Sequence, residues 1–122
     1  MNHRFTKKEH LRKKKEFQIV FDKGNGFGND QIIIYALLNK SPVSRLGLVV
    51  GRKFGNSVKR NRFKRIIREA YRLNKNLLGK GVDLVVIPKA GLADISLSLV
   101  EDKFKNLLIQ INEQLKNEIH TY

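Results

Sequence analysis

The 122-residue sequence contains no cysteine and no long apolar run. Without cysteine the protein can form neither disulfide bonds nor thiolate metal sites. No apolar stretch approaches the roughly 20 residues that a membrane-spanning helix needs. The basic amino terminus is not followed by the apolar core of a signal peptide. We therefore expect a cytoplasmic protein with no membrane partner.

Groups of residues typical of catalytic sites are also lacking. The histidines, His3, His10 and His120, lie near the two termini, and none has a companion at metal-ligand spacing. The aspartates are scattered, so no paired carboxylates are expected to hold two metal ions. The glycine-containing stretches match neither the dinucleotide fingerprint nor the phosphate-binding loop. These absences predict that the protein performs no catalysis with its own side chains and binds no metal by itself.

Acidic residues are few compared with basic ones. The chain has 25 Lys and Arg but 11 Asp and Glu, a formal net charge of +14. Such an excess destabilises a compact monomer by self-repulsion, so an anionic partner is expected. Nucleic acid is the first candidate, because neutralising its phosphates releases counterions. An anionic membrane surface is the second candidate. It would require a basic amphipathic helix with lipid-facing aromatic residues, and we favour nucleic acid over it.

The length and the pattern of apolar residues predict one domain, residues 1–122, of the α/β class, with about three helices packed like a sandwich on a small mixed sheet. The predicted strands are residues 31–38, 45–50 and 82–88, and the predicted helices are residues 7–23, 58–75 and 99–119. The resulting order is α-β-β-α-β-α, to which a further strand can be added. The near-continuous apolar run 82–88 predicts a strand buried on both faces. The third helix is predicted to bury Leu107, Leu108, Ile111 and Leu115.

Other segments are expected to be less regular. Residues 24–30 are rich in turn-forming types. The basic residues 1–7 are expected to be flexible. Ser57 precedes the second helix, and its hydroxyl is a predicted N-cap because it can accept a hydrogen bond from a free backbone N–H.

The second predicted helix has an apolar stripe and a basic face. At helical spacing the stripe consists of Phe63, Ile66, Ile67, Ala70 and Tyr71. The opposite side consists of Asn61, Arg62, Lys64, Arg65, Arg68 and Arg72. Like charges at this spacing repel each other, and guanidinium groups can donate to two phosphate oxygens. We interpret the face as RNA-binding, with Asn61 able to reach a base edge or a 2′-hydroxyl; the alternative is a basic face that is only solvated.

The first predicted helix combines aromatic and basic residues. Phe17 and Phe21 are one turn apart, with Lys13 and Lys14 nearby. Rings beside lysines suit single-stranded RNA, since bases stack on rings while cations follow the backbone. Tyr35 in the first predicted strand can line the same surface. From the residues alone, the alternative that the two Phe are core residues is the stronger one.

Residues 45–72 read RLGLVVGRKFGNSVKRNRFKRIIREAYR and closely resemble the signature of the bacterial ribonuclease P protein subunit. The centre of that signature is the Arg-Asn-Arg motif, here residues 60–62. The resemblance extends over nearly the whole chain, through EFQIVF around Phe17 and Phe21 to VDLVVIPK before the last helix. It favours the interpretation of the two Phe as cleft residues.

The resemblance implies a ribonucleoprotein enzyme that removes the 5′ leader from precursor tRNA. In that family the RNA subunit holds Mg²⁺ and hydrolyses the phosphodiester, so the protein alone is expected to be inactive, to bind no cofactor and to require no protein partner. Contact with the catalytic RNA is carried over to Arg52, Lys53, Arg60, Asn61, Arg62, Lys64, Arg65 and Arg68. A cleft between the first helix and the sheet, for the single-stranded leader, is carried over to Lys13, Lys14, Phe17, Phe21 and Tyr35. The resemblance also implies a left-handed β-α-β crossover, against the general preference for right-handed ones.

Three other functions fit parts of the pattern. A ribosomal or RNA-chaperone protein would bind RNA through the same charges but would need only one surface. A stand-alone nuclease would cleave RNA with Mg²⁺ and no added RNA subunit. A DNA-binding protein would place the basic helix in a major groove and prefer duplex DNA.

Overall fold

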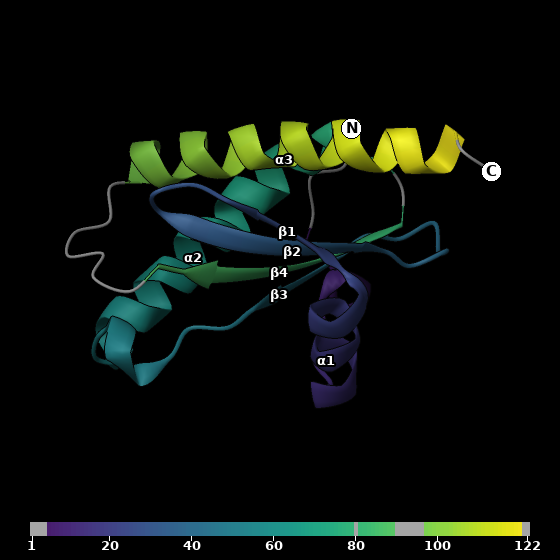
Figure 1. Ribbon diagram of the computed structural model, residues 1–122. Coiled ribbons are helices and arrows are strands. Elements are labelled where there is room, and N and C mark those ends of the chain that lie inside the picture. Colours follow the sequence, from purple (N-terminus) through teal and green to yellow (C-terminus); the bar gives the residue numbers. More distant parts are fainter. Residues whose placement is uncertain (1–4, 80, 90–96, 121–122) are drawn as a thin grey trace.

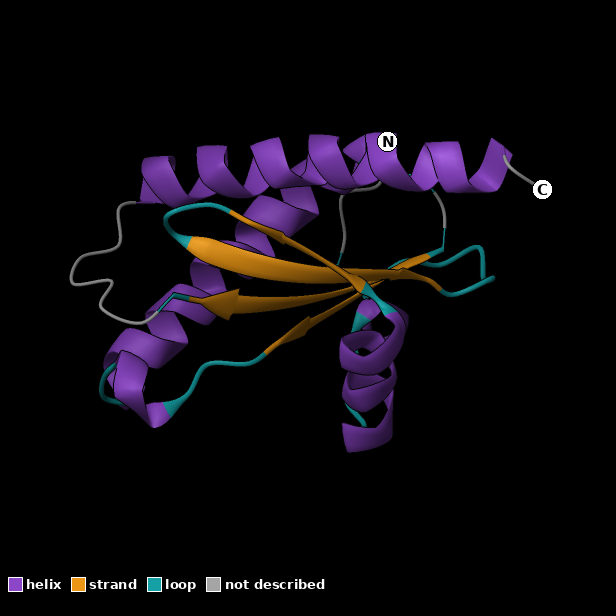
Figure 2. Ribbon diagram, viewed as in Figure 1, coloured by secondary structure: helices purple, strands orange, loops and turns teal. Residues whose placement is uncertain are grey.

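The fold is a four-stranded mixed sheet with helices on both faces (Figures 1 and 2). The computed structural model describes residues 5–79, 81–89 and 97–120. In chain order the elements are the 3-10 helix Lys7–Glu9, α1 (Lys14–Lys23), β1 (Asn25–Gly28), β2 (Ile32–Leu38), β3 (Arg45–Leu48), the 3-10 helix Arg52–Phe54, α2 (Ser57–Asn74), the 3-10 helix Lys75–Leu77, β4 (Val82–Pro88) and α3 (Leu97–His120). The predicted class and element order are confirmed, and β1 is the additional strand.

The strands lie in the order β1-β2-β4-β3. β2 is antiparallel to both of its neighbours, with Ile34 opposite Phe27 on one side and Val86 on the other. β3 runs parallel to β4, with Gly47 opposite Val85. The helix α2 is therefore the crossover between two parallel strands, and the left-handed sense of this crossover stays a prediction.

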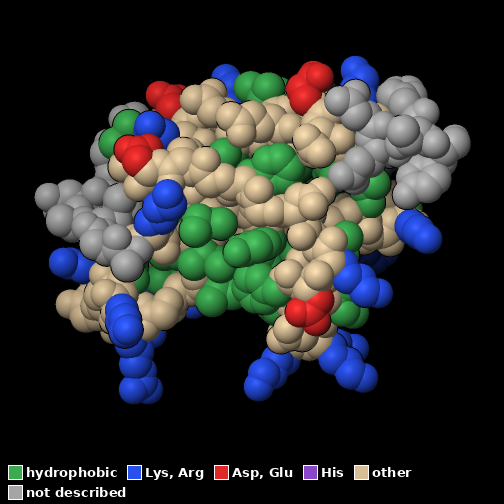
Figure 3. Space-filling view, in the orientation of Figure 1, with side chains coloured by type: hydrophobic (Ala, Val, Ile, Leu, Met, Phe, Trp, Pro, Cys, Tyr) green, Lys and Arg blue, Asp and Glu red, His purple; other side chains and the backbone are tan. Residues whose placement is uncertain are grey.

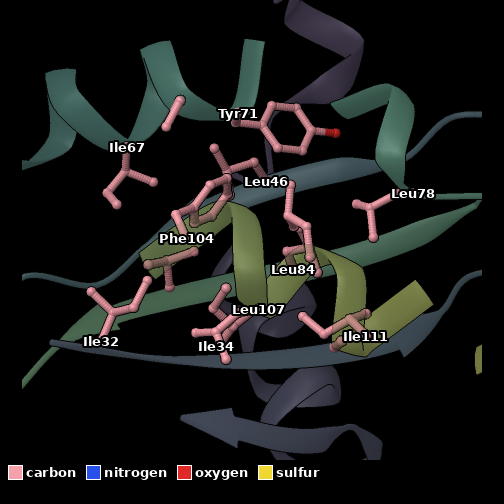
Figure 4. Packing of buried hydrophobic residues seen from close by; sticks show 14 of the residues in the cluster. Ile32, Ile34, Leu46, Ile67, Tyr71, Leu78, Leu84, Phe104, Leu107 and Ile111 are labelled. Atoms are coloured by element: carbon pink, nitrogen blue, oxygen red, sulfur yellow. The ribbon is translucent and has the colours of Figure 1, made fainter. Parts of the chain in front are cut away.

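One face of the sheet forms the main core with α2 and α3. Along β2, Ile32, Ile34 and Ala36 are buried on this face, as the two-residue period of a strand requires. The predicted apolar stripe of α2 and the four predicted residues of α3 are all buried, which confirms both. Figure 4 shows Ile34 of β2 in one cluster with Leu107 of α3 and Tyr71 of α2. Each such side chain stabilises the fold by about 1.5–3 kcal/mol, so this core fixes which side of α2 faces solvent.

A smaller apolar cluster lies on the opposite face of the sheet, between the sheet and α1. Its buried members are Leu11, Val20 and Val85. Around them pack the half-buried side chains of Phe17, Phe21, Tyr35, Leu37 and Ile87. Figure 1 shows that α1 covers only part of this face. β4 thus has apolar contacts on both faces, which confirms the prediction from its near-continuous apolar run.

The prediction of one helix over residues 7–23 is wrong in its first part. Lys7–Glu9 is a separate 3-10 turn, and His10 then pairs with Leu46 in an isolated parallel bridge. The backbone N–H of Leu11 donates to the carbonyl oxygen of Leu46 at 2.9 Å, and the Leu11 side chain is buried. These contacts with β3 outweigh the helix propensity of the lysine-rich segment.

The N-cap of α2 also differs from the prediction. Asn56 has an extended backbone, and its Oδ1 accepts from the backbone N–H of Lys59 at 3.0 Å. Asn56 is therefore the N-cap, and Ser57 is the first helical residue. The turn-rich residues 24–30 were expected to form a loop, but they contain β1 because they pair with β2 at the edge of the sheet.

Part of the amino-terminal segment packs against the domain. The ring of Phe5 stacks on His10 with centroids 3.9 Å apart and meets Tyr71 edge-on at 5.3 Å. Flexibility was predicted for residues 1–7. Residues 1–4 lie outside the described residues, so for them it stays a prediction. Within residues 5–79, 81–89 and 97–120, none of the helices is long and apolar enough to cross a membrane.

Candidate RNA-binding surfaces

The solvent-facing side of α2 and the turn before it form a basic surface. The exposed members of the predicted set are Arg52, Lys53, Asn61, Arg62, Arg65 and Arg68. The first two belong to the 3-10 helix that precedes α2, and the others lie along α2 itself. Because the apolar stripe anchors the other side of α2, Asn61, Arg62, Arg65 and Arg68 are presented to solvent together, as the periodicity predicted.

A hollow of about 400 Å³ lies on this basic surface. It is lined by Phe5, Asn61, Arg65, Arg68, Glu69 and Arg72. Arg72 donates to both oxygens of Glu69, at 2.5 and 3.1 Å, and this hydrogen bonding lowers the pKa of Glu69. Arg65 and Arg68 form no ion pair with any other described residue, so their guanidinium groups are available to an anion such as phosphate.

Arg60 and Lys64 lie at the border of the basic surface. Both are half-buried, and the Nε of Arg60 is buried without a hydrogen-bond partner among the described residues. Lys64 was expected at the solvent side opposite the stripe. The structure instead places it at the flank of α2, where with Arg68 it borders a second hollow that also contains Phe17.

The partly open face of the sheet brings the predicted leader contacts together. The rings of Phe21 and Tyr35 meet edge-on, with centroids 5.2 Å apart. Lys13 and Lys14 are exposed at the beginning of α1. Figure 3 shows hydrophobic side chains gathered below the sheet, between Lys and Arg side chains on both sides. Because the rings are half-buried, they pack as core residues do and still present part of their surface to solvent.

Phe17 lies directly on the backbone of β3. A Cβ atom added to Gly47 would be 2.5 and 2.6 Å from two carbons of the Phe17 ring, closer than real contacts allow. Gly47 was not among the predicted site residues. A glycine inside a strand is a sign of such close approach, and it is the signal by which this position can be found in the sequence.

The second hollow, of about 90 Å³, connects the two surfaces. It is lined by Phe5, His10, Leu11, Phe17, Leu46, Gly47, Leu48, Lys64 and Arg68. Burial and the positive charges of Arg12 and Arg68 lower the pKa of His10. A chain that lay on Phe17 would reach the imidazole of His10 and two cations of α2, Lys64 and Arg68, at the end of the sheet face.

Several carboxylates in the described part of the chain are paired with basic side chains. Glu9 accepts from the Nζ of Lys75 at 2.8 Å, and Asp83 and Glu16 both accept from Arg45. No group of three His, Asp or Glu side chains among the described residues is arranged to hold a metal ion. These side chains are therefore suited to structure and to electrostatics, and the surfaces around them are suited to binding a polyanion.

Comparisons with known proteins agree with this geometry. A family model described as Ribonuclease P matches residues 5–112. The ribonuclease P protein component of Thermotoga maritima is 38% identical over 115 residues, which cover 91% of this chain and 98% of that protein. The solved structure of the Thermotoga maritima RNase P protein matches with a TM-score of 0.77 and covers 84% of this chain and 96% of that one. A Staphylococcus aureus RNase P protein structure, 31% identical, matches with a TM-score of 0.76 and covers 82% and 92%.

Proposed function

This chain belongs to the ribonuclease P protein family, and from that premise we propose that it is the non-catalytic subunit that helps a catalytic RNA to remove the 5′ leader from precursor tRNA. One observation carries the proposal: an open sheet face lined with aromatic rings ends against a basic helix. An accessory subunit must contact both its RNA partner and the substrate. Two different surfaces that meet at one hollow support this double task.

The basic surface is assigned to the catalytic RNA. Its proposed contacts are Arg52, Lys53, Arg60, Asn61, Arg62, Lys64, Arg65 and Arg68. Support comes from the positive charge of all of them except Asn61, and from the exposure of most of them on one rigid helix and the turn before it. Arginine forks fit phosphate oxygens, and the Asn61 amide can pair with a base edge or a 2′-hydroxyl.

The partly open face of the sheet is assigned to the single-stranded leader. Its proposed contacts are Lys13, Lys14, Phe17, Phe21 and Tyr35. Unpaired bases stack on exposed ring surfaces, and the lysines at the beginning of α1 can follow the phosphates. Lys64 and Arg68 border the same hollow as Phe17, so either RNA can approach them.

Phosphodiester hydrolysis is assigned to the RNA partner. Mg²⁺ held by that RNA would supply an activated water and neutralise the developing charge. The paired state of Glu9, Glu16 and Asp83 supports a protein that is inactive alone and binds no Mg²⁺ itself. We also place the holoenzyme in the cytoplasm, with the catalytic RNA and precursor tRNA as its partners and no other protein required.

The two assignments are tested by two alanine variants in the holoenzyme. Arg65→Ala should weaken binding of the catalytic RNA, because Arg65 is exposed and has no ion pair among the described residues. Phe21→Ala should lower the affinity for precursor tRNA with a leader more than the affinity for mature tRNA. Equal losses for the two tRNAs would contradict the leader assignment. Tight RNA binding without any leader preference would favour a ribosomal or RNA-chaperone protein instead.

A further inference from the structure

Arg45 on β3 joins α1 to the sheet through two carboxylates. Its Nε and Nη2 donate to the two oxygens of Asp83 at 2.9 and 2.7 Å, and its Nη1 donates to Glu16 at 2.5 Å. Asp83 on β4 is 5% exposed, and Asn39 donates to the same carboxylate at 2.7 Å. The guanidinium group of Arg45 is therefore held against the sheet by Asp83 of β4, while its Nη1 donates to Glu16 of α1.

Glu16 uses its two oxygens for different purposes. Oε2 accepts from Arg45, while Oε1 accepts from the backbone N–H groups of Arg12 at 3.3 Å and Lys13 at 3.1 Å. These backbone hydrogen bonds, together with Arg45, hold the pKa of Glu16 below its usual value. One ionised side chain thus caps the first turn of α1 and ties that turn to the sheet.

The neighbouring contact between the same two elements is that of Phe17 with Gly47. Phe17 follows Glu16 on α1, and Gly47 lies two residues after Arg45 on β3, so Arg45 and Gly47 face the same side of the sheet. The ring of Phe17 lies so close to Gly47 that a Cβ would be 2.5 Å from it. The ionic contact and the ring contact are therefore adjacent, and both join the first part of α1 to β3.

We propose that Arg45, acting through Glu16, is a positioning residue that sets the distance between α1 and the sheet and thereby the shape of the leader cleft. This role rests on the proposed function, since it concerns the surface assigned to the leader. Neither side chain has to touch RNA. The hydrogen bonds between Arg45 and Asp83 keep the guanidinium group on the sheet. The hydrogen bond between Arg45 and Glu16 then fixes the position of α1 relative to that group.

The experiment uses Glu16→Gln with two measurements. Glutamine has the same size but a single acceptor oxygen, so it cannot serve both the helix cap and Arg45, whereas the buried Arg45–Asp83 pair is left intact. The first measurement is the NMR chemical shift of the Gly47 α-protons in the free protein, which the ring current of Phe17 displaces; a Phe17→Leu protein gives the value without the ring. The second is the ratio of the holoenzyme's affinities for precursor tRNA and mature tRNA.

We expect the Gly47 signal of Glu16→Gln to move toward its value in Phe17→Leu, because the charge-assisted hydrogen bond that holds α1 on the sheet is lost. The affinity ratio should fall severalfold, because a displaced α1 no longer shapes the cleft for the leader. Arg45→Lys should give the same two changes, since an ammonium group lacks the planar fork that serves both carboxylates. The matched control is Glu9→Gln, which breaks the Glu9–Lys75 ion pair outside α1. It should change neither measurement. A thermal melt of each variant establishes that it is folded.

The outcomes separate this inference from the proposed function. If Glu16→Gln leaves both measurements unchanged, Arg45 does not position α1. If the ratio falls while the Gly47 signal stays in place, the positioning role is refuted, because Glu16 then acts on RNA without moving the helix. If the signal moves while the ratio is constant, α1 is positioned as described but the cleft does not hold the leader, and the leader assignment fails with the inference.

Discussion

The contact between Phe17 and Gly47 makes the substitution Gly47→Ala informative. The added methyl group would lie 2.5 and 2.6 Å from two ring carbons and 3.0 Å from the Cβ of Leu11, so the ring and α1 have to move. Overpacking of this kind costs about 1–3 kcal/mol. Replacing glycine by alanine also restricts the unfolded chain, which offsets about 0.4–1 kcal/mol. Combining these two ranges gives a net loss of about 0–2.6 kcal/mol in the free energy of unfolding, and we expect a value near the middle of that range, about 1–2 kcal/mol.

The assay is urea and thermal unfolding followed by far-UV circular dichroism, and a fall in Tm of roughly 3–8 °C corresponds to this loss for a domain of this size. Gly51→Ala is the matched control, because a Cβ at Gly51 has no atom within 4 Å and its backbone is extended, with φ −79° and ψ 167°. That variant should be as stable as the unmodified protein or slightly more stable. If Gly47→Ala unfolds at the same temperature as Gly51→Ala, Phe17 does not lie on β3 and the description of the cleft is refuted.

Three further predictions concern the basic helix, its cap and α1. Arg65→Ala should reduce the steepness with which log affinity for the catalytic RNA falls with log salt concentration, by about one unit per lost phosphate contact. Arg72→Ala should reduce it less, because Arg72 is paired with Glu69. Equal slopes for the two variants, measured by filter binding, would contradict the assignment. Asn56→Ala should lower the free energy of unfolding, measured with urea, by about 1 kcal/mol, and Ser57→Ala should lower it much less. The reverse order would show that Ser57 is the N-cap. The backbone hydrogen bonds and Arg45 that lower the pKa of Glu16 give stability that is present above its unfolded pKa, near 4.5, and lost as pH falls through the lower folded value. The Glu16→Gln protein should therefore lose less stability than the unmodified protein over that acid range, and parallel curves of stability against pH would show that Glu16 is not linked to folding.

The regular parts of the fold could be predicted because their signals are local. The stripe from Phe63 to Tyr71 has helical spacing, and the run 82–88 is apolar except for Asp83, so both elements and their buried sides follow from a few neighbouring residues. The first helix was predicted too long because the segment before it is held by the Leu11 contact with Leu46, a partner 35 positions away in the sequence. Strand β1 was missed as such because its pairing with β2, and not its glycine-rich composition, makes it a strand.

The basic surface could likewise be predicted from one helix, whereas the organisation of the cleft could not. The exposure of Arg62 and Arg65 follows from the register of a single element. The position of Phe17 depends on Gly47, and the position of α1 depends on Arg45 and its two carboxylates, which come from three separate elements. Only the fold brings these groups together, and it also turns Lys64 from the solvent side toward the cleft.

The central claim is tested most directly by cleavage of a precursor tRNA with a 5′ leader at low Mg²⁺. Three samples are compared: the protein alone, bacterial ribonuclease P RNA alone, and the two combined. We predict accurate leader removal that appears, or rises sharply, only in the combined sample, because the protein contributes binding surfaces and the RNA contributes the chemistry. No stimulation of the RNA despite tight binding would contradict the account, and cleavage by the protein alone would show that it contains an active site of its own.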